Sequence, residues 1–202
     1  MSGASLFPIG ELTRPAGALV TLEPLESRHA EELWEAAQDP RTWSWLANLA
    51  DRRRFEQWME LSLAAVAEGR EGVFAVRCRA DGVVVGSSRY LAVRPADRAL
   101  EIGWTWFNPA AWRTGINLET KLLMLEHAFE TLECVRVEFK TDARNERSRN
   151  AIAALPAQFE GIFRNHMIVP DVGQRDSAFF SVIDSEWPTV RATLERRLAQ
   201  VE

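Results

Sequence analysis

Residues 100–117 read LEIGWTWFNPAAWRTGIN and combine a strand, a loop and the beginning of a helix. Successive residues of a strand point to opposite faces, so residues 100–107 should divide between two faces. We expect one face to carry Leu100, Ile102, Trp104 and Trp106 and the other to carry Glu101, Gly103, Thr105 and Phe107. Apolar residues then recur at helical spacing to about Thr131, and the alternation over 135–140 predicts another strand.

Patterns on either side of this stretch predict the other elements of a mixed α/β domain. Strands are expected at 17–23, 73–78, 83–91, 159–169 and 177–183, and helices at 27–39, 51–69, 145–155 and 188–199. A chain of 202 residues is long enough for one well-buried core. We therefore expect a single domain at 17–202, preceded by an N-terminal arm at 1–16.

Composition excludes several classes of protein. The formal net charge of −5 argues against a bulk electrostatic attachment to nucleic acid or to an anionic membrane. Two cysteines and three scattered histidines argue against a disulfide framework and a metal site. We find no signal peptide and no membrane span, so we expect a cytoplasmic protein. Lys121 and Lys140 are the only lysines, and we attach no function to that scarcity.

The segment 112–117, Trp-Arg-Thr-Gly-Ile-Asn, lies where the loop gives way to a helix. Such a junction presents unpaired backbone N–H groups and the positive end of the helix dipole, which suit a phosphate. Gly115 would let a ligand approach the backbone, and Arg113 would add a charged contact. The alternative is that Gly115 eases a tight turn and that Arg113 is solvated.

Two further groups have both a chemical and a structural interpretation. Glu101, partly desolvated by aromatic neighbours, could remove a proton from an amine, or it could be an exposed residue paired with Arg89 or Arg98. Asn145 and Ser148 could contact a ligand between two parallel strands. Alternatively, Asn145 could be the N-cap of the short helix that begins there, and Ser148 a polar residue of its first turn.

Taken in order, these motifs resemble the GNAT superfamily of acetyl-CoA-dependent N-acetyltransferases. The resemblance rests on Glu-Ile-Gly-Trp at 101–104, Asn-Pro at 108–109, the segment 112–117 and Thr-Asp-x-x-Asn-x-x-Ser at 141–148. It extends over roughly residues 17 to 187 and is specific. Within the superfamily, the chain resembles the branch that contains ribosomal-protein-alanine N-acetyltransferases.

The resemblance implies a fold and a cofactor site. The fold is a mixed, mostly antiparallel sheet, flanked by helices and splayed between the fourth and fifth strands, with acetyl-CoA in the opening. By similarity, the pyrophosphate rests on backbone amides of the loop and the pantetheine pairs with main chain of the preceding strand, while one amide side chain meets the cofactor from the other side. The loop residues are Arg113, Thr114, Gly115, Ile116 and Asn117. The strand residues are Trp106 and Phe107, and the amide side chain is that of Asn145.

The resemblance also implies direct acetyl transfer without a metal or a covalent enzyme intermediate. Glu101 helps to deprotonate the amine, a strand amide near Trp104 to Trp106 holds the oxyanion, and Ser148 or water protonates the leaving thiolate. Many relatives place a tyrosine near the sulfur, but the central region of this chain has none.

Two hypotheses follow for the function. The first is an N-acetyltransferase that acts on a primary amine, either a protein N-terminus or a small molecule, with a homodimer as a family-level expectation. The alternative is a non-catalytic CoA-binding sensor or scaffold, which would need the phosphate loop but neither Glu101 nor Ser148. The acceptor groove should be built from the two N-terminal helices and the loop 170–174, and the net charge favours a cationic acceptor.

Overall fold

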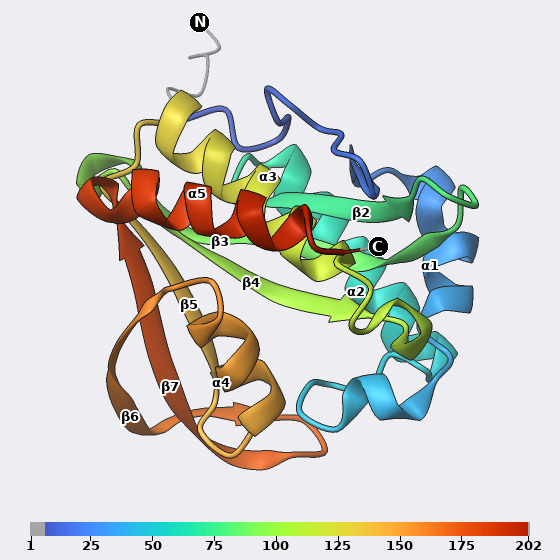
Figure 1. Ribbon diagram of the computed structural model, residues 1–202. Coiled ribbons are helices and arrows are strands. Elements are labelled where there is room, and N and C mark those ends of the chain that lie inside the picture. Colours follow the sequence, from blue (N-terminus) through green and yellow to red (C-terminus); the bar gives the residue numbers. More distant parts are fainter. Residues whose placement is uncertain (1–6, 202) are drawn as a thin grey trace, which may run out of the picture.

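The computed structural model describes residues 7–201 and has a seven-stranded sheet at its centre (Figure 1). The strand order is β1-β2-β3-β4-β5-β7-β6, and every neighbouring pair is antiparallel except β4 and β5. The expected mixed, mostly antiparallel sheet is therefore confirmed. The strands are β1 (Val20–Pro24), β2 (Gly72–Cys78), β3 (Val84–Arg94), β4 (Ala99–Phe107), β5 (Arg136–Asp142), β6 (Gln158–Val169) and β7 (Gly173–Ile183).

Five α-helices flank the sheet in the described part of the chain. They are α1 (Ala30–Ala36), α2 (Arg52–Ala67), α3 (Ile116–Glu126), α4 (Glu146–Ala153) and α5 (Trp187–Leu198). A π-helical turn, His127–Thr131, continues α3 to the residue at which the sequence pattern ends. Among residues 7–201, no helix is long and apolar enough to cross a membrane.

The helices bury apolar side chains on both faces of the sheet, and β2 shows the division. Phe74 and Val76 belong to a core cluster with residues of α3 and α5, whereas Val73 and Ala75 belong to a second cluster with α1 and α2. Apolar residues of α4 join the first cluster, so α4 covers the same face as α3 and α5 (Figure 1). The continuous apolar run of β2 is the pattern expected of a strand buried on both faces.

The two parallel strands pair over three residues only. Ala99, Leu100 and Glu101 lie opposite Arg136, Val137 and Glu138, and no pairing follows. Beyond these residues, β4 remains paired with β3, and β5 remains paired with β7. The sheet therefore divides at Glu101, which confirms the predicted splay between the fourth and fifth strands; we call this place the divergence point.

A β-bulge at Trp104 changes which side chains share a face of β4. Arg89 of β3 lies opposite Gly103, but Ser87 lies opposite Trp106, so β4 has one extra residue between them, and Trp104 has a φ of 46°. Trp104 and Trp106 consequently pack with the α1–α2 cluster, whereas Thr105 faces Lys121 of α3. The strict alternation predicted for 100–107 is wrong from Trp104 onward, because a bulge shifts the period by one residue.

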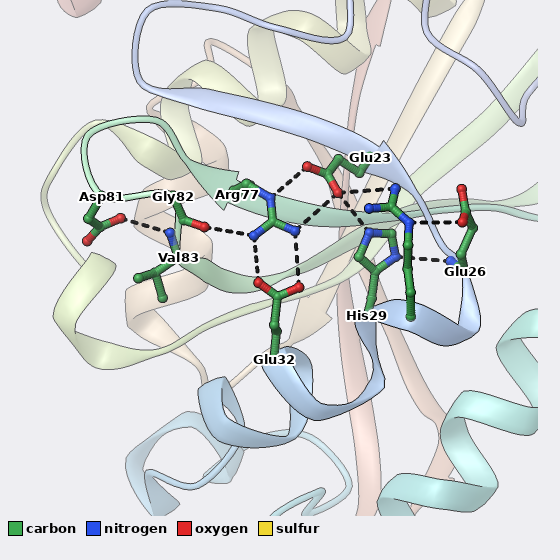
Figure 2. A network of polar contacts seen from close by, with 9 residues as sticks. Glu23, Glu26, His29, Glu32, Arg77, Asp81, Gly82 and Val83 are labelled. Atoms are coloured by element: carbon green, nitrogen blue, oxygen red, sulfur yellow. Dashed lines mark hydrogen bonds and ion pairs between the residues drawn. The ribbon is translucent and has the colours of Figure 1, made fainter.

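An ion-pair network fixes α1 against the outer edge of the sheet (Figure 2). Arg77 of β2 contacts Glu23 of β1 at 2.7 Å and Glu32 of α1 at 2.6 Å, and His29 contacts Glu23 at 2.8 Å. The hydrogen bond from Arg77 is the main reason that the pKa of Glu23 falls to about 2. The network lies on the strands farthest in the sheet order from β5 and β7.

The segment before β1 also packs onto the core. Phe7, Ile9 and Leu12 are buried and belong to the cluster of α3 and α5. The Glu119 carboxylate of α3 accepts hydrogen bonds from three successive backbone N–H groups, those of residues 18–20, at 2.7, 2.6 and 2.7 Å. This contact joins the start of β1 to the first turn of α3.

Candidate active site

Glu101 lies at the divergence point, with only 3% of its surface exposed. Its Oε2 is 2.9 Å from Nζ of Lys140 on β5. The prediction of an exposed Glu101 paired with Arg89 or Arg98 is wrong, because those arginines pair instead with Glu71 and Glu133. One feature of the sequence pointed to the position of Lys140. It follows Phe139 in the alternating strand β5, and since Val137 and Phe139 point into the core, Lys140 points to the other face of the sheet.

Burial and charge act in opposite directions on Glu101. Burial raises the pKa of Glu101 because the ionised carboxylate loses water, and the Lys140 ammonium offsets part of that rise. Arg175 of β7 also lowers this pKa, whereas Glu138 raises it. Because its pKa is raised, this carboxylate is a stronger base than an exposed glutamate, which suits a general base.

Lys121, the other lysine, is buried on the opposite face of β4. Its Nζ donates hydrogen bonds to Ser88 Oγ at 3.1 Å and to Thr105 Oγ1 at 2.5 Å. Burial lowers the pKa of Lys121 to about 7, so the amine is partly uncharged at neutral pH. Thus the only two lysines of the chain lie on either side of β4 near its divergence from β5, although the sequence analysis attached no function to them.

The loop between β4 and α3 places the beginning of α3 next to the end of β4. Gly115 is the N-cap residue of α3 with a φ of 85°, and no side chain caps the helix. Its first backbone N–H groups thus lack the side-chain acceptor that a serine or aspartate cap would give them. Arg113 and Thr114 of this loop are exposed. An uncapped helix N-terminus beside an exposed arginine fits a pyrophosphate group.

The backbone conformation and the close packing at Gly115 both require a glycine, without regard to any ligand. Its positive φ disfavours other residues, and a Cβ there would lie 2.8 Å from Leu19 Cδ1 and 3.0 Å from Val201 Cγ1. The turn interpretation of Gly115 is consistent with this geometry, since neighbouring side chains already occupy the space that a Cβ would take.

Asn145 and Ser148 lie at the first turn of α4, on the β5 side of the divergence. The Asn145 Oδ1 accepts a hydrogen bond from the Ser148 backbone N–H at 3.1 Å, so the capping interpretation of Asn145 is confirmed. The Ser148 side chain is half-buried, and its hydroxyl has no hydrogen-bond partner in the described part of the chain. Arg147 of the same turn lies 3.8 Å over the ring of Trp112, which joins α4 to the β4–α3 loop.

Trp106 and Phe107 end β4 with their side chains buried on opposite faces. Trp106 packs against Trp43 and Trp58 at ring-centroid distances of 5.1 and 5.9 Å. The Phe107 carbonyl accepts a hydrogen bond from Trp112 Nε1 at 3.1 Å. Trp43 and Trp58 therefore support the end of β4 from the side of α1 and α2.

A hollow of about 460 Å³ lies between three loops that are far apart in the sequence. The 40–48 segment contributes tryptophans, the β5–α4 loop contributes Arg144, and the β6–β7 loop contributes Asp171 and Val172. Arg144 lies 5.3 Å over the Trp45 ring, and Arg54 of α2 forms an ion pair with Asp171. The segment between α1 and α2 and the β6–β7 loop thus come together around this hollow.

Within residues 7–201, no group of three or more histidine, cysteine, aspartate or glutamate side chains is arranged to hold a metal ion. The site consists instead of one buried carboxylate, two lysines, a helix N-terminus and two divergent strands.

Comparisons with known proteins agree with this arrangement. The family model described as "Acetyltransferase (GNAT) domain" matches residues 20–157, and a GCN5-related N-acetyltransferase from Brucella melitensis is 32% identical. That structure superposes with a TM-score of 0.85, over 98% of this chain and 90% of that chain. The fold is that of an acetyl-CoA-dependent acyltransferase. The chain belongs to the GNAT acetyltransferase family, which uses acetyl-CoA.

More distant structures share the fold. RimJ of Mycobacterium smegmatis, solved in complex with CoA-disulfide, is 23% identical, with a TM-score of 0.75 over 94% of this chain and 93% of that chain. The microcin C7 self-immunity acetyltransferase MccE, solved with acetyl-CoA and AMP, is 16% identical, with a TM-score of 0.75 over 85% of this chain and 98% of that chain. A search of curated proteins finds no match.

Proposed function

We propose that this protein transfers the acetyl group of acetyl-CoA directly to a primary amine, with Glu101 as the general base. The observation that carries the proposal is the buried Glu101 carboxylate at the divergence point, held by Lys140 at 2.9 Å. In a family that uses acetyl-CoA, a base at this place can meet both the amine and the thioester. The acceptor is a small molecule or a protein N-terminus.

The chemistry balances with the groups in place. Glu101 takes a proton from the ammonium form of the acceptor, and the free amine attacks the thioester carbonyl. The C–N bond forms and the C–S bond breaks, and the leaving thiolate takes a proton from the Ser148 hydroxyl or from water. The nitrogen, now bonded to the acetyl carbon, releases its second proton, which replaces the one that Ser148 or water has given up. The bulge at Trp104 supports a role for backbone N–H groups of 104–106 at the oxyanion, since a bulge leaves a residue outside the ladder.

The cofactor contacts that we propose follow the same geometry. Backbone amides of Arg113 to Asn117 hold the pyrophosphate at the uncapped start of α3, and main chain at Trp106 and Phe107 pairs with the pantetheine. Asn145 contacts the cofactor from the β5 side, with whichever amide atoms its capping bond leaves free.

The test measures CoA release and acetylated product with purified protein, acetyl-CoA and a panel of amines. Glu101→Gln keeps the shape of the side chain and removes the base, so we expect kcat to fall by about a hundredfold or more. The KM for acetyl-CoA should change little. Glu60→Gln, at an exposed position of α2, is the matched control and should behave as the unchanged protein.

Two results would contradict the proposal. Wild-type turnover by Glu101→Gln from about pH 6 to 9 would show that Glu101 is not the base. Binding of acetyl-CoA without any acetylated product across the amine panel would favour the sensor or scaffold hypothesis.

A further inference from the structure

The face of β5 and β7 that turns away from α4 carries a row of polar side chains next to Glu101. In the β5–β7 register, Lys140 lies opposite Phe179 and Asp142 lies opposite Ser177, so these four side chains share a face. The alternate residues, including Phe139 and Phe180, pack into the core on the other face. Arg175 lies two residues before Ser177 and thus belongs to the polar face.

Arg175 is buried on this face and lacks a carboxylate partner. Only 6% of its surface is exposed, and its Nε donates to Ser177 Oγ at 3.0 Å. Neither Nη atom has a hydrogen-bond partner among residues 7–201, and the guanidinium forms no ion pair with a carboxylate of those residues. Because its Nε bonds to Ser177, two residues further along the strand, the Arg175 side chain lies along β7 toward Phe179, the residue opposite Lys140.

The nearby carboxylates already have other partners. Glu101 pairs with Lys140, Asp142 pairs with Arg144 at 2.8 Å, and Glu138 pairs with Arg136 at 2.9 Å. Glu101 and Asp142 attract Arg175 through space, but burial is the largest effect and lowers the pKa of Arg175.

A second basic group lies beside Arg175. Nδ1 of His166 on β6 is 3.0 Å from the same Ser177 Oγ. Burial, Lys140 and Arg175, in that order, lower the pKa of His166, so the three basic side chains lie near one another. A buried guanidinium with two free Nη atoms matches the paired oxygen atoms of a carboxylate or a phosphate.

We infer that the acceptor amine carries an oxyanion, a carboxylate or a phosphate, which Arg175 binds while Glu101 faces the amine. This inference rests on the proposed acetyl transfer and narrows its acceptor. A buried guanidinium without a hydrogen-bonded anion is costly, and a bound oxyanion would accept hydrogen bonds from its free Nη groups. The net charge of the protein favours a cationic acceptor, whereas the local positive charge of Arg175 favours an acceptor that also carries an anionic group.

The experiment compares matched pairs of amines that differ only in the oxyanion. Each amino acid is paired with its carboxamide, and O-phosphoethanolamine is paired with ethanolamine. Binding is measured by calorimetry on protein loaded with CoA, which has no acetyl group to transfer, and turnover is measured separately with acetyl-CoA. We expect at least one oxyanion-bearing amine to bind about tenfold or more tightly than its partner. The pair that shows this difference distinguishes a carboxylate from a phosphate.

Variants test the assignment to Arg175. In Arg175→Gln, the preference for the oxyanion should fall below about threefold, whereas the exposed Arg53→Gln control on α2 should keep it. Arg175→Lys retains the charge without the planar fork, so it should keep part of the preference. If Arg175→Gln does not fold, Arg175→Lys and the wild-type pairs still decide the question.

The binding and turnover measurements test the oxyanion site and the acetyl-transfer proposal separately. Equal binding of all pairs, or an undiminished preference in Arg175→Gln, would overturn the oxyanion assignment even if amines are acetylated. A preference that depends on Arg175 without acetylation would support the oxyanion site and contradict the acetyl-transfer proposal.

Discussion

Glu101 and Lys140 come from parallel strands at the last residues where those strands remain close together. Glu138 lies opposite Glu101 in the β4–β5 register, and Lys140 lies two residues further along β5. The ion pair between Lys140 and Glu101 therefore joins β4 and β5 where they separate. The ammonium keeps the Glu101 carboxylate ionised at a lower pH than burial alone would allow. Lys140 thus acts through Glu101, and we treat it as a positioning residue.

Removal of the Lys140 charge should change the pH profile of catalysis. In Lys140→Met, the pKa of Glu101 loses the interaction that lowers it and rises further. A general base must be deprotonated, so the acidic limb of kcat/KM should move to higher pH. The measurement is kcat/KM against pH for the wild type and the variant.

The conservative variant provides the control. Lys140→Arg retains a cation beside Glu101 and should return the acidic limb most of the way to its wild-type position. A Lys140→Met profile that is lower at every pH but unshifted would show that Lys140 has only a structural role.

At the scale of single residues, the sequence identified Glu101 but not its surroundings. The identity of the partner depends on the register between β4 and β5, which are joined through a loop, a helix and a turn, and no local pattern specifies that register. The bulge at Trp104 likewise had no clear signal, because the residues of 100–107 fit a regular strand. No sequence pattern singled out Arg175, since its lack of a carboxylate partner is a property of the folded site.

Among the elements, α3 and the loop before it show why one glycine is needed at Gly115. The chain leaves β4, turns through Arg113 and Gly115 at φ of 66° and 85°, and enters the helix without a side-chain cap. The backbone N–H groups at this uncapped start of the helix are the ones that we propose for the pyrophosphate.

Gly115→Ala should weaken both stability and cofactor binding. The positive φ alone costs about 1–2 kcal/mol for a residue with a Cβ, and the close approach of Leu19 adds to it. The displaced loop should raise the KM for acetyl-CoA by about tenfold, measured beside a denaturant titration.

Gly69→Ala is the matched control for this change. Gly69 also has a positive φ, 68°, but a Cβ at this position would meet no atom within 4 Å, and the residue follows α2 rather than the loop. The Gly69→Ala variant should lose a similar amount of stability, because its alanine must also adopt a positive φ, and its KM for acetyl-CoA should stay unchanged. An equal rise in KM in both variants would show that general destabilisation, and not the loop, causes the effect.

The elements themselves were largely predictable. Helical spacing identified α2, α3 and α5, and alternation identified β5, because each buries one stripe or one face. The beginning of β7 was predicted at Ser177, but the strand begins at Gly173. The missed residues contain Gln174 and Arg175, polar side chains that carry no strand signal by themselves.

For the whole molecule, the buried Lys121 should make stability depend on pH. In the unfolded chain its pKa is near the ordinary value of 10.5, whereas in the folded protein it is about 7. The unfolded state therefore binds more protons between these values, and the free energy of unfolding rises with pH there. Below about pH 7 the full cost of burying the amine is present.

Lys121→Met isolates this contribution. The variant should be more stable than the wild type at about pH 6, and the difference should shrink toward about pH 10, by at most about 1.4 kcal/mol per pH unit. Ser88 and Thr105 remain 2.8 Å apart and can bond to each other without the amine. Denaturant titrations at several pH values measure the difference; curves that stay parallel would contradict the assignment to Lys121.

The early separation of β4 and β5 has a consequence for self-association. Each strand keeps a neighbour on its outer side, but beyond Glu101 and Glu138 each also presents a free backbone edge within the sheet. Such edges usually invite another chain to add a strand, and proteins protect them when they lie at the rim. Here the two edges belong to neighbouring strands inside the sheet and not to its rim, so a strand that added to one edge would lie next to the other strand.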